Sequence, residues 1–211
     1  MNECPLCGHQ PPDRSLNSSD NRLFHLCGRC FLLHADPCHH PDSESEKKRY
    51  LSHNNGIEHQ GYVDFLNRSI VPALQFLKQG MHGLDYGCGP APTLSALLEE
   101  RGMPCDNYDP FFFPHLLPGR KYDFIFSTEC FEHFFYPGRE IPKLLALAKA
   151  GGHLIIMTDL WKNPEEFASW SYGRDFTHVS FYHAGTLNWI SKHYGIPKVY
   201  DDGVRVAIFR C

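Results

Sequence analysis

The chain of 211 residues is long enough for one sizeable domain with its own core and a small appended module. Its composition is ordinary for a globular protein, and a formal net charge of −4 with a pI near 6.4 gives no general attraction to nucleic acid. The sequence contains no apolar run of 18 residues, and Met1 to Pro5 have neither a charged start nor an apolar stretch for export. We therefore expect a cytoplasmic protein with no membrane segment.

The first feature along the chain is a pair of Cys-x-x-Cys motifs separated by 19 residues. In a reducing compartment, cysteines more often bind metal or lie in the core than form disulfides. The spacing is typical of a zinc ribbon, with Gly8 and Gly28 permitting the tight turns, whereas a redox dithiol would not explain two matched motifs. Thiolates would fill all four positions of a tetrahedral ion, so we expect it to be structural rather than catalytic. The predicted zinc ligands are Cys4, Cys7, Cys27 and Cys30.

The segment after the ribbon carries three histidines and one more cysteine. A second metal site here is the less favoured alternative, because histidines crowded in a loop can be solvated or bind ions adventitiously. These residues are His34, Cys38, His39 and His40. Pro41 to Arg49 is polar and of mixed charge, which predicts a linker or the start of an exposed helix. We therefore expect a zinc-ribbon module at 1–40, a linker or lid segment at 41–60 and a main domain at 61–211.

The main domain alternates helical and strand patterns. Apolar residues from Gly61 to Lys78 recur at helical spacing, and Pro72 would kink this helix. The elements predicted next are a strand at 84–86, a helix at 93–101 closed by Gly102, a strand at 105–108 and a buried parallel strand at 124–126. They are followed by a helix at 139–149, a strand at 154–158, a helix at 186–193 and a terminal hairpin with a half-buried strand at 204–208.

The turn after the first of these strands has the most informative sequence, Leu84-Asp85-Tyr86-Gly87-Cys88-Gly89-Pro90-Ala91. Small residues at 87, 89 and 91 let the backbone approach a bound ligand. Asp109 follows Asp85 by 24 residues, and its carboxylate could accept hydrogen bonds from ribose hydroxyls. A dinucleotide-binding oxidoreductase would need glycine at position 92, where Pro92 stands, and no Lys-Ser or Lys-Thr pair completes a phosphate-binding loop.

This turn resembles the first motif of the class I S-adenosylmethionine-dependent methyltransferases, an acid, any residue, Gly, any residue, Gly after an apolar strand. Asp85, Gly87 and Gly89 match it, while Ala91 replaces the familiar third glycine. The resemblance continues in order through residues 122–129, the pair Glu132-His133 and residues 151–157, and it covers about residues 50 to 211. It implies a Rossmann-like α/β sheet with a C-terminal antiparallel strand. It also implies S-adenosylmethionine as the methyl donor.

The resemblance also implies where the chain is shortened. Only 13 residues separate Asp109 from Asp123, too few for the helix, strand and loop that many of these enzymes carry here. Phe111-Phe112-Phe113 lies in this connection, where it either covers the adenine or, as we favour, anchors the loop in the core.

The donor contains a cationic sulfur, which is favoured beside aromatic faces and carboxylate oxygens. Tyr86, Tyr108 and Glu129 are available for those roles, and Asp85 is expected to orient the glycine turn and the donor's amino group. The predicted cofactor-binding residues are Asp85, Tyr86, Gly87, Gly89, Tyr108, Asp109, Thr128 and Glu129.

Methyl transfer is an in-line displacement, so the enzyme mainly aligns donor and acceptor. If the acceptor is a hydroxyl, an amine or an acidic carbon, a base must take its proton, and histidine suits that task. The candidates are His133, in the shared motif, and His178, in the segment 175–183 expected near the acceptor. A capping or packing role is the alternative for each.

Two further segments bear on the acceptor. Residues 50–55 and Tyr62 resemble the entry segment of methyltransferases that act on small molecules, and could close as a lid. Trp161, Trp170 and Tyr172 either surround an acceptor cleft or pack the insertion after Met157 onto the domain.

We therefore predict a methyltransferase that acts on a small-molecule acceptor. A zinc ribbon before such a domain also resembles the ribosomal RNA guanine methyltransferases, in which the ribbon binds RNA. Against that alternative, residues 1–60 contain eight Asp or Glu and six Lys or Arg, without the expected excess of positive charge. A non-enzymatic zinc-stabilised binding module is the third alternative, which the intact Asp85, Gly87, Gly89 and Asp109 disfavour. The sequence leaves the oligomeric state open.

Overall fold

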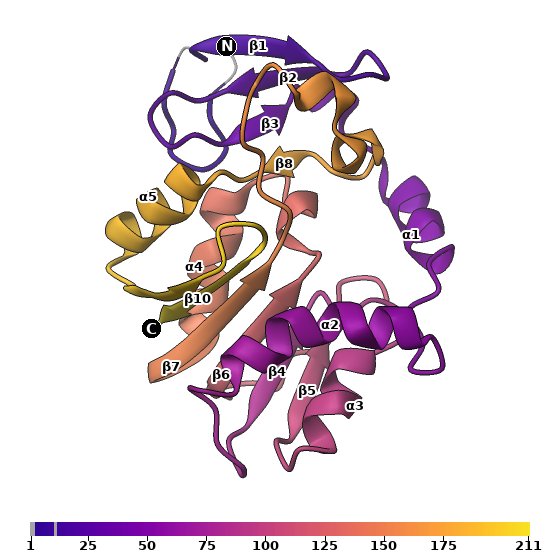
Figure 1. Ribbon diagram of the computed structural model, residues 1–211, viewed down its shortest axis with the longest axis vertical. Helices are drawn as coiled ribbons and strands as arrows, with labels where there is room; N and C mark the ends of the chain where they lie inside the picture. The colour runs from indigo at the N-terminus through magenta and orange to yellow at the C-terminus, as the bar shows by residue number, and fades with distance from the viewer. Residues whose placement is uncertain (1–2, 11) are drawn as a thin grey trace.

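A computed structural model describes residues 3–10 and 12–211 of the chain. The predicted ribbon module and the expectation about the first residues include positions 1, 2 and 11, which lie outside the described residues. The described chain contains two sheets, a six-stranded one covered by helices and a smaller four-stranded one beside it (Figure 1). In the described ranges, no helix combines the length and apolar character that a bilayer span requires.

The large sheet has the strand order β5-β4-β6-β7-β10-β9. Neighbours among β4 to β7 pair in parallel, whereas β10 runs antiparallel to both β7 and β9. The predicted Rossmann-like sheet with a C-terminal antiparallel strand is thus confirmed. The strands are β4 (Gly83–Tyr86), β5 (Cys105–Tyr108), β6 (Tyr122–Thr128), β7 (Ala148–Met157), β9 (Lys198–Asp201) and β10 (Val206–Arg210).

Helices cover both faces of this sheet (Figure 1). One face packs on α2 (Gln60–Ala73) and α3 (Thr93–Glu99), through side chains such as Ile70 and Leu98. The other face packs on α4 (Pro137–Leu147) and α5 (Ala184–Tyr194). Because apolar side chains are buried on both faces, the strands form the centre of the core.

Three predicted elements differ from the structure. The first helix ends at Ala73 instead of Lys78, so Pro72 lies in its last turn and causes no mid-helix kink. The helix predicted at 139–149 is displaced to Pro137–Leu147, because proline fits the first helical turn, where its missing N–H needs no partner. The half-buried terminal strand is also wrong: Val206 to Phe209 are all buried, because β10 lies between β7 and β9 under helices on both faces.

The small sheet has the order β1-β2-β3-β8, with β1 (Arg14–Asn17), β2 (Leu23–Leu26) and β3 (Leu33–Ala35) from the N-terminal segment. Its fourth strand, β8 (Ser180–Phe181), comes from the insertion after β7 and pairs antiparallel with β3. The N-terminal segment is therefore joined to the main domain through a shared sheet. The polar segment predicted as an exposed helix forms α1 (Ser43–Leu51), which buries no residue and is capped by Asp42.

The two sheets also share a core. Cys4, Leu6 and Cys30 belong to the same buried cluster as Tyr182 and Leu187. At the start of α4, the Gly138 amide donates to Pro5 O at 3.0 Å, and a Cβ on Gly138 would lie 2.7 Å from Leu6 O. Only glycine allows this approach without movement of the backbone.

The insertion 158–183 is held by the aromatic residues noted in the sequence. Trp161 and Trp170 cluster with Phe24 of β2 and Phe181 of β8, so the packing alternative holds for both tryptophans. The insertion contains the short 3-10 helices η3 (Phe167–Ser169) and η4 (Ser171–Arg174). Two others are η1 (Pro37–His39) and η2 (Phe131–His133).

The predicted shortening between Asp109 and Asp123 is confirmed. Residues 110–121, all of them described, form turns without a helix, and their one strand-like contact is the isolated bridge between Asp109 and Phe113. The favoured placement of Phe111-Phe112-Phe113 in the core is wrong. All three side chains are half-buried, because so short a connection stays at the edge of the sheet.

Candidate active site

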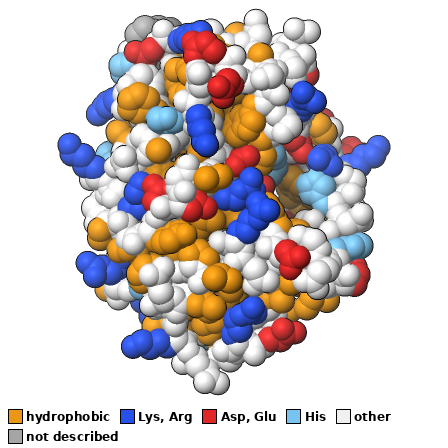
Figure 2. Space-filling view, in the orientation of Figure 1, with side chains coloured by type: hydrophobic (Ala, Val, Ile, Leu, Met, Phe, Trp, Pro, Cys, Tyr) orange, Lys and Arg blue, Asp and Glu red, His pale blue; other side chains and the backbone are white. Residues whose placement is uncertain are grey.

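A cavity of about 880 Å³ opens at the carboxyl ends of β4, β5 and β6. Parallel α/β sheets bind ligands at this edge, and the volume lies within the usual range for ligand pockets. Figure 2 shows the molecule hollowed on this face, with hydrophobic and histidine side chains beside the opening. The walls come from the strand ends, from α1 with the loop after it, and from the loop 173–178.

The glycine turn after β4 forms one wall. Gly87 and Gly89 have φ angles of +88° and +65°, a region that other residues rarely adopt. A Cβ on Gly87 would lie 2.4 Å from Cys130 Sγ, whereas a Cβ on Gly89 would meet nothing within 4 Å. Gly87 therefore fixes the packing of the turn, and Gly89 exposes its backbone to the cavity.

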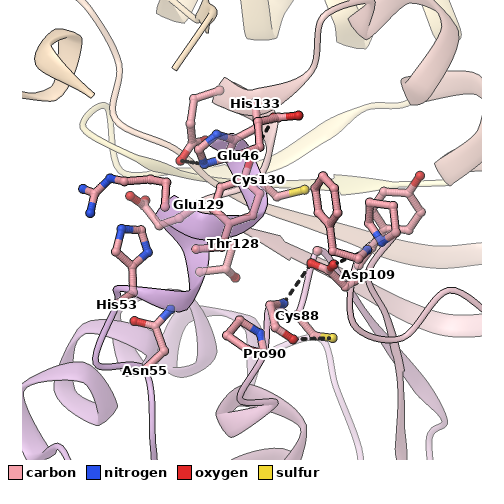
Figure 3. Close-up of a pocket in the computed structure, with 18 of the residues that line it drawn as sticks. Glu46, His53, Asn55, Cys88, Pro90, Asp109, Thr128, Glu129, Cys130 and His133 are labelled. Carbon is pink, nitrogen blue, oxygen red and sulfur yellow. Dashed lines mark hydrogen bonds and ion pairs between the residues drawn. The ribbon is translucent and has the colours of Figure 1, made fainter. Parts of the chain in front are cut away.

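Asp109 ties this turn to the shortened connection. Its Oδ2 accepts a hydrogen bond from the Gly89 amide at 3.1 Å, and its Oδ1 accepts from the amides of Phe111 at 2.8 Å and Phe112 at 3.2 Å. Figure 3 shows Asp109 beside the Cys88 turn, and the residue lines the cavity although it is largely buried. Asp85 lies behind the turn and is not among the lining residues, and burial, followed by the nearby Asp109, raises its pKa to about 7.

Aromatic side chains face the cavity next to the turn. The rings of Tyr86 and Tyr108 lie 4.8 Å apart, and the Tyr86 hydroxyl donates to Glu140 Oε2 at 3.2 Å. Phe111 joins them in the wall. These faces could receive either an adenine or a sulfonium group.

The end of β6 supplies polar groups without partners. Thr128 Oγ1 and Glu129 Oε1 are buried and have no hydrogen-bond partner among the described residues, although both residues line the cavity. Glu129 has a φ of +48°, and burial, followed by Glu132, raises its pKa to about 9. Buried polar atoms left unpaired are costly, so a polar ligand in the cavity fits this wall.

Two histidines meet a buried carboxylate at the other end of the cavity. His133 Nδ1 donates to Thr177 O at 3.0 Å, His178 Nδ1 donates to Tyr172 O at 2.8 Å, and the ring centres lie 4.9 Å apart. His133 Nε2 lies 4.0 Å from Oε1 of Glu132, which is fully buried. Burial, followed by the neighbouring His133, lowers the pKa of His178 to about 4.

Glu132 was missed by sequence reasoning as a site residue. Its only signal is its position directly before His133 in the shared motif. Its carboxylate accepts hydrogen bonds from Tyr172 Oη at 2.6 Å and Thr158 Oγ1 at 2.8 Å. Tyr172 does not line the cavity: it packs beside Trp170 and Phe181, and only its hydroxyl reaches the Glu132 carboxylate.

The predicted lid segment lines the wall across the cavity from Asp109. Tyr50, His53, Asn55 and Tyr62 all face the cavity, and Figure 3 shows His53 and Asn55 across from Asp109. Thr93 of α3 anchors the segment by donating to Asn55 O at 2.6 Å.

The first part of this wall comes from α1. Glu46 and Arg49 line it, and Arg49 pairs with Asp175 of the facing loop at 2.7 Å. Glu46 and Arg49 were not predicted, because the sequence of α1 is merely polar, whereas Asp175 belongs to the segment 175–183 that was expected near the acceptor.

Arg22, in the turn between β1 and β2 of the small sheet, fixes that facing loop. Its guanidinium donates to four backbone carbonyls: Gly173 O at 2.6 Å, Asp175 O at 3.0 Å, His178 O at 3.1 Å and Phe176 O at 3.2 Å. Arg22 is itself buried. The position of Asp175 and His178 in the cavity therefore depends on a residue more than 150 positions earlier in the chain.

The four predicted ribbon cysteines come together, with their sulfur atoms all within 4.8 Å of one another. This spacing suits one tetrahedral ion. Gly8 has a positive φ of +70°, whereas the corresponding residue of the second motif is Phe31 at +59°. Gly28 lies in the second turn without a positive φ. Gly28 instead admits Asp13, whose Oδ2 accepts from its amide at 2.6 Å.

The other cysteine and histidines near the ribbon do not assemble. In the described part of the chain, neither of the two clusters of metal-binding side chains includes His34, Cys38, His39 or His40. His34 is buried, whereas Cys38 is exposed.

The six-stranded sheet, the glycine turn and the cavity at the strand ends define a Rossmann-like methyltransferase. The family model described as a methyltransferase domain matches residues 57–199, so the chain belongs to this family. It is an S-adenosylmethionine-dependent methyltransferase.

Solved structures show the same fold. The 1,6-didemethyltoxoflavin-N1-methyltransferase of Burkholderia thailandensis is 12% identical, with a TM-score of 0.55 over 90% of this chain and 95% of its own. The plantazolicin methyltransferase BpumL is 15% identical, with a TM-score of 0.53 over 80% of this chain and 91% of its own. A comparison with curated protein sequences gave no match.

Proposed function

We propose that this protein transfers a methyl group from S-adenosylmethionine to a small-molecule acceptor. The observation that carries the proposal is the ion pair between Arg49 of α1 and Asp175 of the facing loop, 2.7 Å long, because it joins two walls of the cavity around the histidine end. An acceptor held there must be small enough to fit between them. In support, the structurally similar 1,6-didemethyltoxoflavin-N1-methyltransferase was solved with 1,6-didemethyltoxoflavin and S-adenosylhomocysteine bound.

The donor would lie along the glycine turn. Asp109 would bind the ribose through Oδ2, which accepts one backbone hydrogen bond and keeps a second lone pair, whereas Oδ1 already accepts two. Tyr86 and Tyr108 would face the base or the sulfonium, and Thr128 and Glu129 would gain the polar partners that they lack. When bound, S-adenosylmethionine supplies an electrophilic methyl group. The chain's own contribution is to hold the acceptor atom in line with it.

The acceptor atom would lie at the end of the cavity formed by Glu132, His133 and His178. Because the pKa of His178 is lowered to about 4, its imidazole is neutral near pH 7. We assign to this cluster, and so to the two predicted catalytic histidines, the control of the acceptor's proton.

For the N-terminal segment, the proposed role is structural. One Zn²⁺ held by Cys4, Cys7, Cys27 and Cys30 would have no open position for substrate. It would fix the start of the small sheet, which shares its core with α4 and α5. The ion thereby supports β8 and the loop beside it.

The deciding experiment has two stages on the full chain. Calorimetric titration with S-adenosylhomocysteine should show saturable binding near one equivalent per chain, and absence of binding would remove the donor site. Labelled S-adenosylmethionine is then incubated with separated small-molecule and RNA fractions of a cell extract. Label in the small-molecule fraction supports the proposal, whereas label confined to RNA would transfer the function to nucleic-acid modification.

A further inference from the structure

One carboxylate and two imidazoles meet at the acceptor end of the cavity. The ligand atoms of Glu132, His133 and His178 all lie within 4.8 Å of one another, and all three residues line the cavity. Ligands bound at about 2.1 Å to one ion lie roughly 3–4 Å apart, so only a small closing movement would bring them into coordination. We propose that these residues bind a divalent transition-metal ion, separate from the ion of the ribbon.

The orientation of the imidazoles supports this assignment. Both Nδ1 atoms donate to backbone carbonyls, His133 to Thr177 O and His178 to Tyr172 O. Each ring therefore keeps the lone pair of its Nε2 for a ligand bond. Metal-binding histidines are commonly fixed in this way, by a carbonyl or carboxylate that accepts from the nitrogen not bound to the ion.

The surroundings of Glu132 are the second observation. The residue is fully buried, and its oxygens accept hydrogen bonds from Tyr172 Oη and Thr158 Oγ1. Among the described residues, the only basic group within ion-pair distance is His133 Nε2, at the 4.0 Å limit. Buried carboxylates normally have a charged partner or coordinate a metal. A bound cation would supply that missing charge, and each oxygen retains a lone pair for it.

Three protein ligands leave open coordination positions on the cavity side, as in catalytic sites with two histidines and one carboxylate. The site would also have a chemical consequence, which rests on the proposed function. An acceptor hydroxyl bound at an open position would have a lowered pKa and would release its proton to water. Its oxygen then bonds to the methyl carbon while the carbon–sulfur bond breaks, and the electron pair stays on sulfur as S-adenosylhomocysteine leaves. The inference therefore favours an oxygen acceptor.

The test uses Zn²⁺ as probe on the full chain, loaded and then dialysed against metal-free buffer. We expect about two zinc ions per wild-type chain, one at each cluster, and about one in Glu132→Gln and His178→Gln. His53→Gln is the matched control, since His53 lines the same cavity outside the cluster and should leave the count at about two. Thr158→Val removes only a hydrogen bond to the carboxylate and should weaken the second zinc by about 10–100-fold in calorimetry.

Melting curves and S-adenosylhomocysteine binding establish that each variant is folded. A wild-type chain that binds S-adenosylhomocysteine but holds a single zinc would overturn the metal site alone. Full zinc retention by folded Glu132→Gln would do the same. Two zinc ions without S-adenosylhomocysteine binding would leave the metal site standing and remove the proposed function instead.

Discussion

The donor side and the acceptor side of the cavity are built in different ways. On the donor side, the turn after β4, the end of β5 and the end of β6 all lie within residues 83–129, on adjacent parallel strands. The acceptor side combines α1, η2 and the loop 173–178, and Arg22 fixes that loop from the small sheet. The donor side is therefore held by local geometry, and the acceptor side by contacts between distant parts of the chain. Substitutions in the N-terminal segment should therefore impair the acceptor side and leave the donor side nearly unchanged.

The largest effect is expected from loss of the ribbon ion. Cys27→Ser should remove the zinc, whose binding in structural sites contributes on the order of 10 kcal/mol to folding, and should abolish methyl transfer because β3 no longer supports β8. S-adenosylhomocysteine affinity should change far less, since the glycine turn belongs to the other sheet. Zinc analysis, calorimetry and methyl-transfer assays on the same preparation test this.

Cys38→Ser is the control for this change, because Cys38 is exposed in the same segment and lies outside the cysteine cluster. It should keep the metal and the activity. Equal losses of donor binding and methyl transfer in Cys27→Ser would show that the two sides are not separable.

A substitution on the donor side should have the converse effect, weakening donor binding without loss of the zinc. Asp109→Ala removes a buried carboxylate that accepts three backbone hydrogen bonds and has one lone pair left for the ligand. It should weaken S-adenosylhomocysteine binding by about 10–100-fold, the loss of one charge-assisted bond at ~1.5–3 kcal/mol. Zinc content should not change. Asp106→Ala is the control: Asp106 is in β5, the strand directly before Asp109, but pairs with Arg120 and Tyr122 and does not line the cavity. Equal donor affinities in the two variants would contradict the assignment of Asp109.

An effect of similar size, on the acceptor side, is expected from Arg22→Met. The variant loses four hydrogen bonds to the loop 173–178. We expect kcat/KM for the acceptor to fall by about 10–100-fold, the equivalent of one hydrogen bond to a charged group at ~1.5–3 kcal/mol. Donor affinity should stay close to the wild-type value. Faster hydrogen exchange of the amides at 175–178 would report the release of the loop.

Arg14→Met provides the comparison, because Arg14 also reaches the insertion, through an exposed ion pair with Glu165. Such pairs contribute about 0–1 kcal/mol, so activity and exchange should hardly change. If Arg22→Met slowed methyl transfer no more than Arg14→Met, the acceptor side would not depend on this arginine.

The same contrast explains what the sequence could predict. The strands β4 to β7, the glycine turn and the left-handed Gly102 follow from apolar runs and local backbone chemistry, and the structure contains them. The strand β8 has only two residues, too few for any periodicity, and its pairing with β3 is set by tertiary contacts.

The site residues also fall into those that local sequence predicts and those that only the tertiary structure reveals. The predicted donor residues, except Asp85, line the cavity, and so do His133 and His178. Arg22 stands in an unremarkable polar stretch, and its four carbonyl partners become visible only when the loop folds against the small sheet. The positive φ of Phe31 could not be predicted, because bulky side chains rarely adopt that conformation.

The remaining expected effect is a pH dependence of stability, measured without donor or acceptor, that belongs to the donor side. Burial, followed by Asp109, raises the pKa of Asp85 from 3.8 to about 7. Between these values the folded chain keeps a proton that the unfolded chain has released, so the free energy of unfolding falls as pH rises, by up to ~1.4 kcal/mol per pH unit. Asp85→Asn cannot ionise and lacks this loss. In urea unfolding without ligand, the free energy of unfolding of the variant should therefore rise relative to that of the wild type from pH 5 to pH 8. Parallel profiles would show that Asp85 is already ionised in the folded protein.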